Sequence, residues 1–133
     1  MRFAPVLLCL SVLAAPLAGQ AAEPKYSPAY DRCLASPDGQ STMGMIACAG
    51  AELKLQDARL NRAYQAAMKR LDQPRQRAAL QKAQRAWIAF RDADCASLYD
   101  QDWGSLSRIE ANACMLDHTA RRADALEQYR RLQ

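Results

Sequence analysis

A carboxylate stands among apolar residues near the middle of the chain, where an enzyme could place a general acid. Asp57 belongs to a stripe of mostly apolar residues that continues at seven-residue steps along a long helical pattern. A general acid also needs a cleft and a second titrating group at a suitable distance. The sequence offers no convincing second group, so we predict a structural role for Asp57 and no catalytic residue.

Other polar and aromatic residues on apolar faces give Asp57 possible partners. If two long helices fold back on each other as a hairpin, five side chains should form one buried layer: Asp57, Asn61, Gln84, Trp87 and Arg91. Asp57 would face Arg91 or accept from the indole N–H of Trp87, and Asn61 would pair with Gln84. Such a layer can fix the register of two helices, as buried polar residues do in coiled coils.

The remaining residue types exclude most other site chemistry. His118 is the only histidine, and no CxxC or HxxxH spacing typical of zinc sites occurs. No glycine-rich phosphate loop is present either. We therefore expect no cofactor, no metal and no enzymatic activity.

The cysteines indicate export to an oxidising compartment. Of the five, Cys9 lies in the N-terminal leader, which leaves an even number in the rest of the chain: Cys33, Cys48, Cys95 and Cys114. An even number in a small exported chain predicts two disulfides. Two pairings fit the predicted helices almost equally well: Cys48–Cys95 with Cys33–Cys114, or Cys33–Cys48 with Cys95–Cys114.

Residues 1–22 have the pattern of a signal peptide. Arg2 precedes an apolar run, and small residues follow at the end of that run. Cys9 is a poor lipidation site because bulky residues precede it. We expect cleavage, no membrane insertion afterwards and a periplasmic or secreted protein without a lipid anchor. Residues 23–40, punctuated by prolines, are expected to form an extended N-terminal arm before a domain at 41–133.

Three helical patterns fill that domain, at 41–71, 74–98 and 106–129. Pro74 suits the first turn of the second helix, and Gly104 marks the break before the third. Short connections between long helices favour antiparallel neighbours. The sequence predicts an all-α fold, with an antiparallel helical hairpin plus a third helix in a small disulfide-bridged bundle. The formal charge of +4 is too small to indicate nucleic-acid binding.

The chain resembles the family of small exported bacterial proteins with a lysozyme inhibitor LprI-like N-terminal domain. The resemblance extends over nearly all of the chain after the leader, and two residue strings carry most of it. These are Leu60-Asn61 with Asp57 and Tyr64, and Ala83-Gln84-Arg85-Ala86-Trp87 with Phe90-Arg91-Asp92 and Cys95. The resemblance implies an all-helical, cysteine-bridged domain of the cell envelope. The family takes its name from a lipoprotein that inhibits lysozyme, and this chain lacks the lipidation motif of that protein.

Two functions follow from these observations. The first is inhibition of a lysozyme-type glycosidase by a loop before the third helix, whose candidate contact residues are Tyr99, Asp100, Asp102 and Trp103. Aromatic anchors flanked by charge are common in protein interfaces. In a purely connecting loop, Trp103 would instead fold back on the core. The second function is an envelope adaptor that binds another protein and does not act on lysozyme. The sequence does not predict an oligomeric state.

Overall fold

A computed structural model describes residues 23–131 of the chain, so the predicted signal peptide lies outside the described part. The fold is all-α, as predicted. Its elements are α1 (Pro28–Ala35), the short 3₁₀ helix η1 (Asp38–Gln40), α2 (Thr42–Lys69), α3 (Pro74–Ala96) and α4 (Gly104–Gln128). The three long helices begin and end within two residues of the predicted bounds. Ser41 caps α2 by accepting from the backbone N–H of Gly44 at 3.0 Å.

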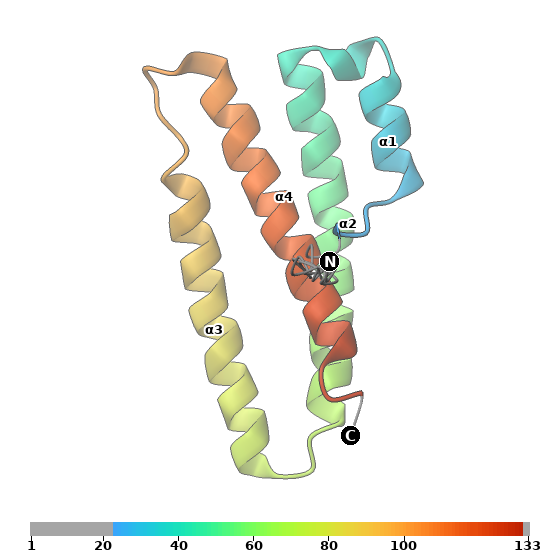
Figure 1. Cartoon of the computed structure of the whole chain (residues 1–133), viewed down its shortest axis with the longest axis vertical. Coiled ribbons are helices and arrows are strands. Elements are labelled where there is room, and N and C mark those ends of the chain that lie inside the picture. Colours follow the sequence, from blue (N-terminus) through green and yellow to red (C-terminus); the bar gives the residue numbers. More distant parts are fainter. Residues whose placement is uncertain (1–22, 132–133) are drawn as a thin grey trace, which may run out of the picture.

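The main packing in the bundle joins α2 to α4, which are not consecutive in the chain. Figure 1 shows α4 between α2 and α3, with α3 on the outer side. The predicted packing of α2 against α3 within the hairpin is therefore wrong. The chain does turn back after α2, but α3 packs mainly on α4 and contacts α2 very little. A hairpin in which residues of α2 lie opposite residues of α3 therefore does not predict the contacts of either helix.

The core forms where α2 and α4 meet, near the end of the bundle that holds the α2–α3 turn. Its buried members are Leu60, Ala63, Ala67, Leu71, Leu80, Ala123 and Leu126. Small alanines on both helices allow the two backbones to approach closely, and leucines fill the remaining space. Trp87 and Tyr129 pack against the margin of this cluster. Of α3, Leu80 belongs to this cluster and Trp87 packs against it, so α3 is the least buried of the three long helices.

The segment 23–40 is not an extended arm, contrary to the prediction. It contains α1, which begins after Ser27; the Ser27 hydroxyl accepts from the backbone N–H of Tyr30 at 3.3 Å. Pro28 occupies the first helical position, where its missing N–H costs nothing. Prolines that suggested an extended chain therefore mark the boundaries of two short helices.

Both disulfides connect elements that are neighbours along the chain. Cys33 of α1 is bonded to Cys48 of α2, and Cys95 of α3 is bonded to Cys114 of α4. Of the two pairings that the sequence left open, this one is correct because α2 and α3 do not pack together. Cys48 lies near the start of α2 and Cys95 near the end of α3, so both bridges lie away from the α2–α3 turn.

Two glycines allow η1 to approach the start of α2. A Cβ added at Gly44 would lie 1.8 Å from the backbone oxygen of Asp38, and one added at Gly39 would lie 1.9 Å from that of Cys33. A backbone atom cannot move aside as a flexible side chain can. The packing around Cys33 therefore depends on the absence of side chains at both positions.

Gly44→Ala is expected to lower the free energy of unfolding by about 2 kcal/mol, because the new methyl group overpacks a backbone contact. Gly50→Ala is the matched control in the same helix, since a Cβ there meets nothing within 4 Å. That control should raise stability by about 0.5–1 kcal/mol through helix propensity. Urea denaturation of both variants measures the difference. Equal effects would contradict the close approach at Gly44.

In the stretch from residue 23 to residue 131, none of the helices combines the length and the apolar character that crossing a membrane requires.

Candidate functional site

The predicted polar layer is split, and its α2 members are not buried. The Asp57 side chain is 52% exposed, and its Oδ1 lies 3.7 Å from a terminal nitrogen of Arg91. Asn61 is also exposed. Both residues line a hollow of about 380 Å³ between α2 and α3. The ion pair across this hollow is open to solvent, so its contribution to stability is small.

The buried half of the layer joins α3 to α4. Gln84 accepts from Nε of Arg122 at 2.9 Å and does not pair with Asn61 as predicted. Trp87 lies beside two guanidinium groups, with 5.1 Å from its ring centroid to Arg91 and 5.7 Å to Arg122. Burial lowers the pKa of the Arg122 guanidinium. These contacts connect α3 to α4.

The buried carboxylate of α2 is Glu52, which the sequence analysis did not single out. Its side chain is 2% exposed. It accepts from the backbone N–H of Ser27 at 2.8 Å, from the Ser27 hydroxyl at 2.5 Å and from Nε2 of Gln56 at 2.7 Å. Gln56 also donates to the backbone oxygen of Lys25 at 2.9 Å. This network fastens the N-terminal segment to α2, so its role is structural.

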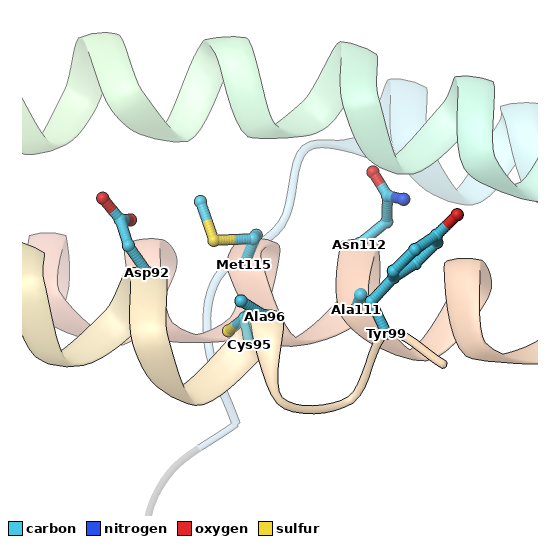
Figure 2. Close-up of a pocket in the computed structure, with 7 residues that line it drawn as sticks. All are labelled: Asp92, Cys95, Ala96, Tyr99, Ala111, Asn112 and Met115. Carbon is cyan, nitrogen blue, oxygen red and sulfur yellow. The ribbon is translucent and has the colours of Figure 1, made fainter. Parts of the chain in front are cut away.

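A more open surface lies at the disulfide end of the bundle. A hollow of about 360 Å³ is formed by seven residues of α3, α4 and the start of their connection: Asp92, Cys95, Ala96, Tyr99, Ala111, Asn112 and Met115. Figure 2 shows the side chains of Asp92, Tyr99, Asn112 and Met115 directed to the same side, toward α2. Small alanines and the disulfide sulfur form much of the wall, and polar groups stand at its margins. Such a hollow fits an apolar side chain that carries a polar or charged tip.

A second hollow of about 440 Å³ adjoins the first and shares Tyr99 with it. Its remaining lining comes from the start of α2 and the start of α4: Thr42, Met43, Ile46, Gln101, Gly104, Ser105 and Arg108. The Tyr99 ring therefore stands between two adjacent depressions. A partner that fills both would cover the connection between α3 and α4.

Hydrogen bonds to α4 and within the connection support its backbone. The fully buried Ser107 hydroxyl donates to the backbone oxygen of Asp100 at 2.7 Å. The Asp100 carboxylate accepts from the backbone N–H of Asp102 at 2.8 Å. Gly104 has a φ of 63°, which a glycine adopts without strain. A loop ordered before binding loses less conformational entropy when it meets a partner.

The side chains around the two hollows are unusually exposed for their size. Trp103 is 65% exposed and Met43 is 68% exposed, and Leu106, Leu98 and Tyr99 are also in contact with solvent. The prediction that Trp103 of a connecting loop would fold back on the core is therefore wrong. Asp100 and Asp102 lie exposed beside it. We call this surface the disulfide-end surface: Met43, Leu98, Tyr99, Asp100, Asp102, Trp103 and Leu106.

The sequence predicted four of these seven residues as contact residues. It did not predict Leu106 and Met43, because their exposure depends on where they lie in their helices. Leu106 shares the 3–4 spacing of the buried residues of its helix, but it lies in the first turn of α4 and is exposed. Met43 is a flexible apolar residue of a type that often fills a core. Its place in the first turn of a capped helix is the signal that could have favoured exposure.

Comparisons with known proteins find a matching family model and similar proteins. A family model described as "Lysozyme inhibitor LprI" matches residues 33–126. An uncharacterized protein of Rhizobium meliloti (strain 1021) is 30% identical over 138 aligned positions, which cover 94% of this chain and 92% of that protein. The uncharacterized protein YecT of Escherichia coli (strain K12) is 36% identical over 110 positions, covering 71% of this chain and 68% of YecT. No solved structure matches significantly.

Proposed function

Because the chain belongs to the lysozyme inhibitor LprI family, we propose that it is an exported binding protein that inhibits a lysozyme-type glycosidase. The disulfide-end surface would make the contact, and no catalysis by this chain is involved. The observation that supports this proposal most directly is the exposure of Trp103 and Tyr99 on a loop whose backbone accepts a hydrogen bond from the buried Ser107.

The form of the surface suits a glycosidase cleft. Such enzymes act through a pair of carboxylates in an open cleft, and an inhibitor must occupy that cleft with a rigid protrusion. The α3–α4 connection projects from the end of the bundle (Figure 1). Trp103 supplies a large apolar anchor there, and the two hollows around Tyr99 could receive side chains from the rim of the enzyme.

Charge favours a basic enzyme at this end of the molecule. Asp100 and Asp102 are exposed on the loop, and Asp92 lines the first hollow. The whole chain carries a formal charge of +4, so the overall charge does not steer it toward a basic protein. The acidic groups would therefore act at short range, and the inhibition should weaken as salt increases.

Trp103→Ala is expected to weaken inhibition by about 30-fold or more, which corresponds to a hot-spot loss of about 2 kcal/mol. Asp102→Ala should weaken it less, because a charge at the rim contributes less than a buried anchor. The measurement is a titration of the purified protein, with disulfides intact, into lysozyme turnover assays with several lysozyme types.

The melting temperatures of both variants should stay close to that of the parent chain, because both side chains are exposed. Asp72→Ala, at the exposed α2–α3 turn, is the matched control and should leave inhibition unchanged. Asp100→Ala is less informative because its carboxylate also holds the loop. No inhibition of any lysozyme type at micromolar excess would contradict the proposal and favour the envelope adaptor.

A further inference from the structure

Four metal-ligating side chains meet beside one of the two disulfides. These are Asp94 and Cys95 of α3 with Cys114 and His118 of α4, and their ligand atoms all lie within 4.8 Å of one another. Nε2 of His118 is 3.0 Å from Oδ2 of Asp94. The four-residue spacing from Cys114 to His118 puts both on one face of α4. Each helix therefore contributes two of the four ligand atoms.

We propose that the reduced form of this chain binds one Zn²⁺ ion through these four side chains. Two thiolates, one imidazole and one carboxylate make a donor set of the kind that zinc takes in tetrahedral protein sites. The thiolates favour zinc over magnesium or calcium, which prefer oxygen ligands. The metal would tie α3 to α4 in the reduced chain, as the Cys95–Cys114 bond does in the oxidised chain. This inference does not depend on lysozyme binding.

The redox step that opens the site is a thiol–disulfide exchange. A dithiol reductant passes two electrons and two protons to the Cys95–Cys114 bond and is itself oxidised to a disulfide. The S–S bond breaks, and two thiols form. When Zn²⁺ binds, the two thiols release two protons to solvent and coordinate as thiolates, while His118 binds as the neutral imidazole. The same chain would thus exist either with a disulfide or with a metal at this position.

The second disulfide provides an internal comparison. Within residues 23–131, Cys33 and Cys48 belong to no comparable group of three or more histidine, cysteine or acidic side chains. Two thiols alone bind zinc less tightly than two thiols with an imidazole and a carboxylate. The proposal therefore predicts that the two cysteine pairs differ in metal affinity once both are reduced.

The test uses the full chain with Cys9 replaced by serine, so that no thiol of the leader contributes. One variant also carries Cys33→Ser and Cys48→Ser, and its counterpart carries Cys95→Ser and Cys114→Ser. Each is reduced with a phosphine and titrated with Zn²⁺ by calorimetry and with Co²⁺ by absorption. The first variant should bind one ion per chain and show cobalt–thiolate and tetrahedral cobalt bands. Its oxidised form and the counterpart variant should not.

Ligand substitutions decide whether the site is more than two thiols. His118→Ala and Asp94→Asn, each in the first variant, should weaken Zn²⁺ binding by at least about 10-fold. Equal affinity in all these variants would overturn the proposal, and so would the lack of binding by a reduced, folded chain. If the reduced first variant is unfolded, Zn²⁺ should restore its helical circular dichroism signal. A failure to restore it would also overturn the proposal.

Discussion

Replacing Cys95 and Cys114 together by serine should lower the free energy of unfolding by about 3 kcal/mol. The bond closes a loop across a sequence separation of 19 residues, and its loss returns that conformational freedom to the unfolded chain. The loss of the bond also weakens the attachment of α3 in the native state. Because α3 packs mainly on α4 and adds only Leu80 to the buried apolar cluster, the contacts that remain to its C-terminal half are mostly polar ones to α4, such as Arg91 with Thr119 and Asp94 with His118.

Hydrogen exchange should locate this effect. Amides of α3 are expected to exchange faster in the Cys95→Ser/Cys114→Ser variant than in the parent chain, while amides of α2 in the core change less. The Cys33→Ser/Cys48→Ser variant is the matched control. It removes a bridge of similar span, at a separation of 15 residues, and should leave α3 protection unchanged. A uniform rise in exchange over all helices would contradict the view that α3 is the weakly held element.

Glu52→Ala is expected to destabilise the protein by about 3 kcal/mol, which is large for a single polar residue. Removing the carboxylate leaves two donors of Ser27 and one of Gln56 without their acceptor in a buried place, and unmet hydrogen bonds to a charged group are costly. Urea denaturation measures the loss. Lys54→Ala, at an exposed position of the same helix, should change stability by less than about 0.5 kcal/mol.

The same network makes stability depend on pH. Burial alone would raise the pKa of the Glu52 carboxyl, but hydrogen bonds from Ser27 and Gln56 together lower it below its usual value. A carboxyl with a lowered folded-state pKa stabilises the fold above its unfolded pKa, and this stabilisation is lost as pH falls through the folded-state pKa. The stability difference between the parent chain and Glu52→Gln should therefore be larger at neutral pH than in acid. A difference that grows in acid would contradict this account.

Local features of the sequence predicted the helices because their signals are local. Pro74, Gly104 and Ser41 mark boundaries through backbone geometry and capping, which depend on a few neighbouring residues. The partners of each helix could not be predicted in the same way. Helix spacing shows which residues share a face, but it does not show whether that face meets the next helix or the one after it.

The position of the buried carboxylate illustrates this limit. The buried face of α2 runs through Cys48, Glu52, Gln56, Leu60, Ala63 and Ala67, at steps of three and four. Two polar residues interrupt it, so a neighbouring stripe containing Asp57 was the more apolar choice by sequence. Glu52 and Gln56 are buried because Ser27 and Lys25 satisfy them, and those partners lie about 30 positions away. No local pattern shows such a contact.

The disulfide-end surface was partly predictable for a different reason. Two aspartates and two aromatic residues stand in the five positions before Gly104, and this composition marks a loop that could bind a partner. The hollows beside it were not predictable. The wall of the first hollow includes Cys95, Ala96 and Ala111 from two helices, and such residues carry no binding signal until the helices are placed.

The packing of α2 on α4 also affects how this protein is made. A ribosome synthesises α2 some 35 residues before α4 begins at Gly104, so a nascent chain that ends at α3 has no surface to cover the buried face of α2. The bundle consequently cannot close during translation of its first three helices. Closure of the core therefore requires α4, the last helix along the chain that the structure describes.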